Sequence, residues 1–244
     1  MSDDLWRGLR KEARETLEMR DYSRPDLEER VRGVGARAGE LAAVDPAARP
    51  AWWIPGVEIF TRQVYNQRQR GYFAEFARQG EGRMGTIGFW PRQWATALMH
   101  ADSAKGFHIH PPHIPTGTDP EAWFAALYGD KPAPAQERPY DLEQWDAMFF
   151  LQGTCEMMLV DERAGLPRRR MRFVIEGDNR PGPDNVGIVI PAGVAHGLQS
   201  VGNRDLIMVY GTSTTFAPEN EGRILSSIEQ PSLPGDWTTY FHGR

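Results

Sequence analysis

Short apolar runs separated by turn residues occupy most of the chain from Trp52 onward. The 25 Gly and 19 Pro residues of the 244-residue chain, together with Asn and Asp, supply the turns. Many short strands joined by such turns are typical of a β-sandwich or barrel. The expected strands lie over residues 57–65, 72–76, 94–100, 106–110, 147–160, 170–176, 187–190 and 206–211.

The first fifty residues have a different pattern. Apolar residues recur at every fourth position, which predicts an amphipathic helix over 3–20: Leu5, Leu9, Ala13 and Leu17. A second helix is predicted over 25–41. We therefore expect a helical N-terminal extension over 1–50, followed by a barrel domain over 51–244. A proline-rich insertion over 114–140, with a helix-like piece inside it, has the length of a lid or binding loop.

Composition excludes several classes of protein. The formal net charge of -5 argues against broad nucleic-acid binding, because no excess of positive charge is present for phosphates. The single cysteine, Cys155, excludes an internal disulfide and a cysteine-rich metal site. No run approaches ~20 apolar residues, and the first residues lack the apolar stretch of a signal peptide. A cytoplasmic protein without a membrane partner is expected.

Three of the six histidines stand in the segment HIHPPH at 108–113. On a strand, His108 and His110 share one face because side chains alternate with a period of two. Further along the chain, His196 follows a Pro-Gly turn in the segment PAGVAH. HxH followed by PxGxxH is the two-part signature of a cupin barrel, in which both elements line one cavity. The sequence thus predicts a mainly β, cupin-type double-stranded β-helix, or jelly roll.

Two chemistries are open to such a barrel. In the first, His108, His110 and His196 supply imidazoles to a divalent metal ion, with His113 as a fourth ligand. The glutamate that metal-binding cupins usually add after HxH is absent from this chain. In the second, no cofactor is needed, and one histidine acts as a base beside a separate acid.

Four short blocks in the chain match the motifs of a known family in the same order. The blocks are RGYFAE (70–75), KGFHIH (105–110), IPAGVAHG (190–197) and MVYGTSTTFAPENEGRI (208–224). The chain over 57–229 therefore resembles the dTDP-4-dehydrorhamnose 3,5-epimerase family, the nucleotide-sugar epimerases of the cupin superfamily.

The resemblance implies a function and a site. It implies a homodimer that epimerises a nucleotide-linked 4-keto-6-deoxy sugar next to its ketone, at C3, C5 or both. The general base falls on His108 and the general acid on Tyr210. The remaining substrate contacts, some of them made across the dimer interface, fall on Arg70, Glu75, Gln93, Lys105 and His196.

Several positions depart from the family pattern. Asp146 stands where the family has a lysine for the enolate oxygen, and Phe149 stands where it has an arginine. Reversing the charge at the first position disfavours a developing oxyanion by ~3 kcal/mol or more. Lys105, or Lys131 in the insertion, can supply the missing charge. The aspartate that orients the histidine in the family has only a weak counterpart, Asp236.

These departures leave two alternatives to an epimerase. The first is a metal-dependent isomerase or oxygenase that holds a divalent ion with His108, His110, His113 and His196. The second is a sugar-binding cupin without turnover.

Overall fold

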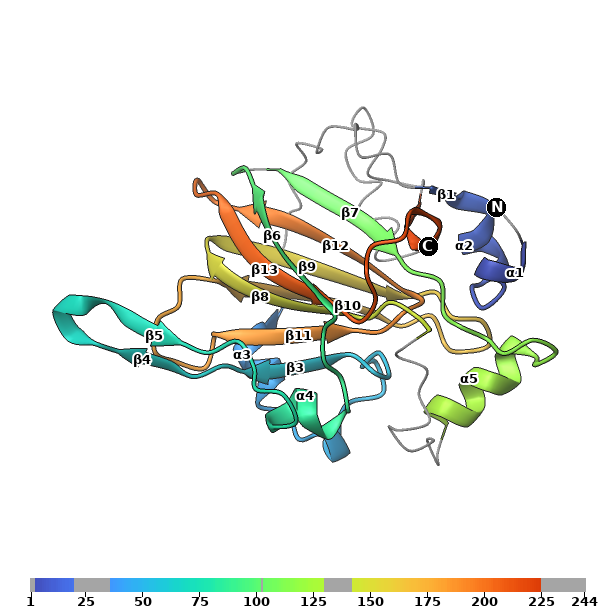
Figure 1. Cartoon of the computed structure of the whole chain (residues 1–244), viewed down its shortest axis with the longest axis horizontal. Helices are drawn as coiled ribbons and strands as arrows, with labels where there is room; N and C mark the ends of the chain where they lie inside the picture. Colours follow the sequence, from blue (N-terminus) through green and yellow to red (C-terminus); the bar gives the residue numbers. More distant parts are fainter. Residues whose placement is uncertain (1–2, 20–35, 102, 130–141, 225–244) are drawn as a thin grey trace.

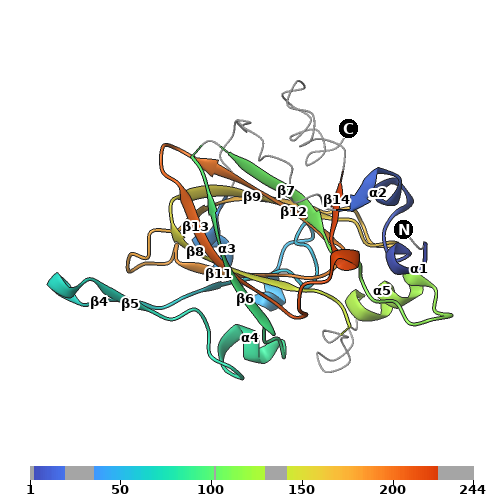
Figure 2. The same cartoon turned by 45° about the horizontal axis from the view of Figure 1, so that its top comes forward.

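Two facing β-sheets form the body of the protein in the computed structural model, which describes residues 3–19, 36–101, 103–129 and 142–224. The larger sheet contains, in spatial order, β1 (Leu17–Met19), β14 (Gly222–Ile224), β7 (Ala104–Ile109), β12 (Val194–Val201), β9 (Thr154–Asp161), β10 (Arg170–Glu176) and β2 (Ala36–Arg37). The smaller sheet contains β3 (Glu58–Thr61), β11 (Val186–Ile190), β8 (Asp146–Gln152), β13 (Leu206–Thr212) and β6 (Gln93–Met99). The sheets are the opposite walls of a barrel (Figure 2), and the predicted mainly β, cupin-type fold is confirmed.

The helices are short and lie outside the barrel. They are α1 (Asp3–Trp6), α2 (Lys11–Thr16), α3 (Ala38–Ala42), α4 (Gly82–Thr86) and α5 (Pro120–Tyr128). A two-stranded ribbon, β4 (Val64–Asn66) and β5 (Tyr72–Ala74), projects away from the barrel (Figure 1). None of the helices in the described part of the chain has the length and hydrophobicity that a membrane crossing needs.

The N-terminal helices differ from the sequence prediction. The helix predicted over 3–20 is divided into α1 and α2 and ends where Leu17–Met19 pairs with Gly222–Ile224 as a strand. Most of the helix predicted over 25–41 lies outside the described residues. In the insertion the predicted helix is present as α5, where the Asp119 side chain accepts a hydrogen bond from the Ala122 amide as an N-cap.

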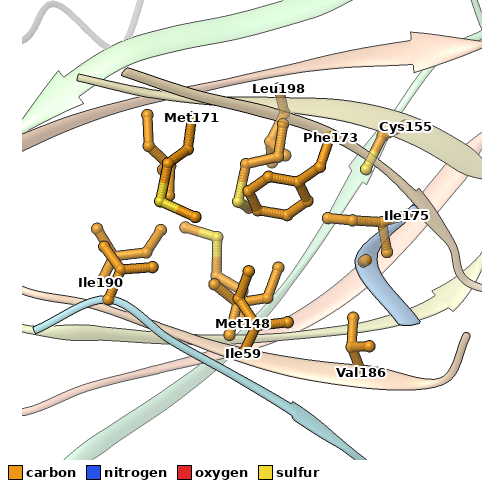
Figure 3. Packing of buried hydrophobic residues seen from close by; sticks show 14 of the residues in the cluster. Ile59, Met148, Cys155, Met171, Phe173, Ile175, Val186, Ile190 and Leu198 are labelled. Carbon is orange, nitrogen blue, oxygen red and sulfur yellow. The ribbon is translucent and has the colours of Figure 1, made fainter. Parts of the chain in front are cut away.

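Strand β9 illustrates how the barrel is packed. Its side chains alternate between the two faces, so Cys155, Met157 and Leu159 join the core inside the barrel. Met158 and Val160 point outward and pack in a second cluster with apolar side chains of α1, α2 and β1. Because both faces are covered, the strand is an almost continuous apolar run in the sequence. Figure 3 shows side chains from both sheets meeting in the inner core.

Four strands fall outside the strand runs expected from the sequence: β1, β2, β12 and β14. Polar residues interrupt the apolar pattern of β12, including His196, Gln199 and Ser200, yet all three are buried. For His196 the interruption has a structural reason, because this side chain lines a cavity next to the core.

Candidate active site

A cavity of about 550 Å³ opens between the two sheets. The larger sheet contributes to its wall Lys105, His108, His196 and Leu198, and the smaller sheet contributes Gln93, Ala97, Asp146, Met148, Met208, Tyr210 and Thr212. Met148, Leu198 and Met208 also belong to the inner core. The packed core therefore forms part of the cavity wall and supports the polar side chains around it.

A β-bulge in β7 determines which of its side chains face the cavity. The pairing of β7 with β12 shifts in register within this strand. As a result Lys105 and His108, three residues apart, both line the cavity, whereas Phe107 between them packs in the outer cluster. Gly106 has a φ of 123°, and a side chain there would come within 2.6 Å of Gly197. Only glycine fits this position.

His108 and Tyr210 line the cavity from opposite sheets. His108 lies on β7, directly across the ladder from His196, and the two rings stack with centroids 5.9 Å apart. Tyr210 lies on β13 of the smaller sheet, where it pairs with Met148 and packs against the inner core. A ligand between the two sheets is therefore flanked by an imidazole and a phenol.

A second group of polar side chains forms around Asp146. Its Oδ2 atom is 3.2 Å from His110 Nε2 and 3.4 Å from His196 Nε2. The Gln144 amide donates a hydrogen bond of 3.1 Å to the other carboxylate oxygen and lies 3.0 Å from His110 Nε2. The Gly193 amide, which donates a hydrogen bond of 2.8 Å to the His110 carbonyl, holds the turn before β12 against His110.

Backbone carbonyls orient both imidazoles in this group. His110 Nδ1 is 3.0 Å from the Asn220 carbonyl oxygen, and His196 Nδ1 is 3.2 Å from the Val194 carbonyl oxygen. A carbonyl oxygen only accepts hydrogen bonds, so each Nδ1 carries a proton. The Nε2 atoms of both rings are thereby directed at Asp146.

The charges of His110 and Asp146 stabilise each other. Burial opposes the charge on His110, but Asp146 and, more weakly, Glu221 and the Asn220 carbonyl raise its pKa from 6.5 to about 9. Burial likewise opposes the charge on Asp146, yet His110 and His196 hold the pKa of its carboxyl below the usual value. Without another cation in the site, the two residues form a buried ion pair.

This ion pair predicts a pH dependence of stability. Because the pKa of His110 is higher in the folded than in the unfolded protein, its contribution is complete below pH ~6.5 and is lost as the pH rises through about 9. Over that window we expect the free energy of unfolding, measured by chemical denaturation with a chelator present, to fall by up to ~3 kcal/mol. The His110→Gln variant should have a flatter profile, and parallel profiles for the two proteins would contradict the prediction.

The structure distributes the residues predicted for substrate binding between two places. Gln93, Lys105 and His196 line the cavity. Arg70 and Glu75 lie on the projecting ribbon or next to it, where Glu75 pairs with Arg78 at 3.0 Å. These two residues are thus absent from the cavity wall of their own chain.

The metal-ligand set predicted from the sequence needs correction. In the described part of the chain, the side chains whose ligand atoms all lie within 4.8 Å of one another are His110, His196 and Asp146. His108 lines the same cavity but is outside this group. His113 does not line the cavity. It follows two prolines beyond the end of β7, and its backbone amide donates a hydrogen bond to Glu143.

The sequence alone does not predict the surroundings of Asp146. In the sequence, this residue shows only a reversal of charge at the position where the resembled family has a lysine. A usable signal was present, because the block KGFHIH (105–110) resembles the family motif RGLHxQ and has His110 where that motif has a glutamine. Two departures of opposite charge indicate a pair. Lys131 and Asp236, the other residues predicted for these roles, lie outside the described residues.

Fold and site together define a jelly-roll barrel whose internal cavity carries acid–base side chains from both sheets. No family model matches the chain. The spore coat polysaccharide biosynthesis protein SpsL of Bacillus subtilis is 22% identical over 189 residues, which cover 77% of this chain and 99% of that protein.

Two solved structures share this architecture. A variant of ChmJ, a 3'-monoepimerase from Streptomyces bikiniensis in complex with dTDP, has a TM-score of 0.50 and 18% identity over 69% of this chain and 68% of its own. NovW, a 4-keto-6-deoxy sugar epimerase from Streptomyces spheroides, has a TM-score of 0.50 and 18% identity over 71% of this chain and 70% of its own. The resemblance to the nucleotide-sugar epimerases is thereby confirmed at the level of the fold.

Proposed function

We propose that this protein epimerises a nucleotide-linked 4-keto-6-deoxy sugar at a carbon next to the ketone. The observation that carries the proposal is the position of His108 and Tyr210 on opposite walls of one cavity. Inversion of a carbon centre requires that a proton leave one face and another arrive at the opposite face. An imidazole and a phenol on facing sheets meet this requirement.

The proton transfers use side chains of this chain. The His108 imidazole removes the proton from the carbon beside the ketone, and the electrons of the C–H bond form an enolate. The Tyr210 hydroxyl then donates its proton to the other face of that carbon, which restores the ketone. The imidazolium and the phenolate return to their starting states by exchange with solvent. Cavity groups that stabilise charge at the enolate oxygen lower the barrier to the first step.

The similar proteins support the choice of substrate class. ChmJ was crystallised with dTDP, and NovW is named as an epimerase of 4-keto-6-deoxy sugars. SpsL is named for polysaccharide biosynthesis. The cavity of about 550 Å³ is large enough for a sugar, and Phe216 on its wall offers an apolar surface that is 45% exposed. The cytoplasmic location stays a prediction.

Isotope exchange tests this function. The protein is incubated with a dTDP-4-keto-6-deoxy sugar in D2O, and the C3 and C5 protons are followed by NMR. We expect loss of signal at one or both carbons well above the rate in buffer. Absence of exchange would remove the epimerase proposal for that substrate. If calorimetry then still detected binding, the protein would be a sugar-binding cupin without turnover.

We also propose that the β4–β5 ribbon joins two copies of the chain in a homodimer. The ribbon projects from the barrel (Figure 1) and exposes Tyr65, Tyr72 and Phe73, each about half accessible. Exposed apolar clusters of this kind mark interaction surfaces. In such a dimer Arg70 and Glu75 reach the cavity of the partner subunit, where they contact the nucleotide.

The dimer proposal predicts a change of mass. In light scattering we expect about twice the chain mass of 27.6 kDa for the unaltered protein and a single chain for Tyr72→Ser combined with Phe73→Ser. Leu142→Ser is a matched control, because Leu142 is 61% exposed but outside the ribbon. An unaltered protein that runs as a single chain would overturn the proposal.

A further inference from the structure

Three potential metal ligands converge at one point of the cavity wall. We propose that His110 Nε2, His196 Nε2 and an oxygen of Asp146 bind a divalent first-row transition-metal ion. Their side chains are only 5–7% exposed, and all three line the cavity. They come from the end of β7, from β12 and from β8, so that both sheets hold the site.

The separations of the two Nε2 atoms from Asp146 Oδ2 suit coordination. Ligands about 2.1 Å from a metal lie ~3.0 Å apart at an octahedral right angle and ~3.4 Å apart in a tetrahedron. The distances from Asp146 Oδ2 to the two Nε2 atoms are 3.2 Å and 3.4 Å. Three ligands on one side of an ion leave its remaining positions open toward the cavity.

Outer contacts orient the ligands for this role. The carbonyls of Asn220 and Val194 accept hydrogen bonds from the Nδ1–H groups of the two rings, which directs both Nε2 atoms at Asp146. Such backbone contacts are usual behind histidines that bind metals. Gln144 donates to Oδ1 of Asp146, which leaves Oδ2 for the ion.

A metal ion satisfies this group better than a single proton does. One proton on His110 Nε2 pairs that ring with Asp146 and leaves the His196 Nε2 lone pair facing the carboxylate at 3.4 Å. A divalent ion accepts lone pairs from all three groups at once and balances the carboxylate charge. Two imidazoles and one carboxylate suit Fe²⁺, Mn²⁺, Ni²⁺ or Zn²⁺.

The site has a role in the reaction that rests on the proposed function. Asp146 occupies the position where the epimerase family has a lysine for the enolate oxygen. A divalent ion held there would restore positive charge at this point, with open positions for the ketone oxygen of the substrate. The binding of the metal itself does not depend on the identity of the sugar.

Metal binding to the whole protein is measured directly. Elemental analysis of the purified chain should give about one Fe, Mn, Ni or Zn per chain. After removal of metal by a chelator, calorimetric titration with Zn²⁺ should give one site. Asp146→Asn should weaken Zn²⁺ binding by at least ~100-fold, since outer contacts alone contribute 10–100-fold. His113→Gln is the matched control and should bind Zn²⁺ as the unaltered protein does.

A second measurement covers the case in which Asp146→Asn does not fold. Co²⁺ added to the metal-free wild-type protein should give visible absorption bands of nitrogen and oxygen coordination, and His196→Gln should change them. Failure of the wild-type protein to bind Zn²⁺ or Co²⁺, or unchanged Zn²⁺ binding by folded Asp146→Asn, would overturn the metal site. Full proton exchange by metal-free protein would remove its role in the reaction and leave the epimerase intact. Metal binding without proton exchange on the sugar would leave the metal site intact and remove the epimerase proposal for that substrate.

Discussion

Replacing His108 by asparagine is expected to reduce proton exchange at the carbons beside the ketone by ~10³-fold, within the range of general-base contributions. Asparagine keeps a polar side chain of similar size but cannot take up a proton. His196, which stacks on His108, cannot replace it as the base, because its Nε2 atom is directed at Asp146. The rate is measured by NMR in D2O with the 4-keto sugar nucleotide as substrate.

Two controls separate the loss of a base from the loss of the fold. The His108→Asn variant should still bind the nucleotide in calorimetry and should unfold at nearly the same temperature. His100→Asn changes a histidine whose side chain is 81% exposed and outside the cavity, and it should exchange protons normally. Exchange by His108→Asn at more than a tenth of the wild-type rate would assign the base to another residue.

Replacing Tyr210 by phenylalanine is expected to separate exchange from inversion. The base on the opposite wall can still remove a proton and return one to the same face, so exchange should fall by less than ~10-fold. Formation of the epimerised sugar should fall by ~10³-fold, because no acid remains on the other face. Both quantities come from one NMR experiment in D2O, in which exchange and the appearance of the inverted sugar are followed together.

The matched control for this variant is Tyr128→Phe. Tyr128 lies on α5 beside Arg163 and does not line the cavity, so its loss should leave both rates unchanged. If Tyr210→Phe formed the epimer as fast as the wild type, the phenol would be a packing residue and the acid would have to be sought elsewhere. If exchange and inversion fell together, Tyr210 would position the substrate rather than supply the second proton.

The charges of Asp146 and His110 affect how an enolate can be stabilised in this cavity. A buried carboxylate close to an enolate oxygen opposes the charge that develops there. The structure pairs this carboxylate with two imidazoles, so the local charge depends on what occupies the space between them. A proton gives an ion pair, and a divalent ion gives a positive site. Metal analysis therefore distinguishes whether a proton or a divalent ion sets the charge near the enolate oxygen during the first proton transfer.

The strands and the two histidine motifs followed from the sequence because their signals are local. Apolar runs between turn residues located most of the barrel strands, although not β12 or β14, and the motifs HxH and PxGxxH placed His108 and His196 on one cavity. The four blocks follow one another in the same order as the motifs of the epimerase family, and Tyr210 lies in the last of them, at 208–224. Each of these signals depends on residues that are neighbours in the sequence.

Only the tertiary structure decided the rest of the site. Leu17–Met19 became a strand rather than the end of a helix because the barrel edge at β14 offered hydrogen-bond partners. The bulge in β7 selected Lys105 and His108 for the cavity, and the pairing of β7 with β12 brought His110 to His196. Asp146 joined them from the other sheet. Contacts between distant strands depend on register and on the closure of the barrel, and no local pattern in a single sequence encodes either.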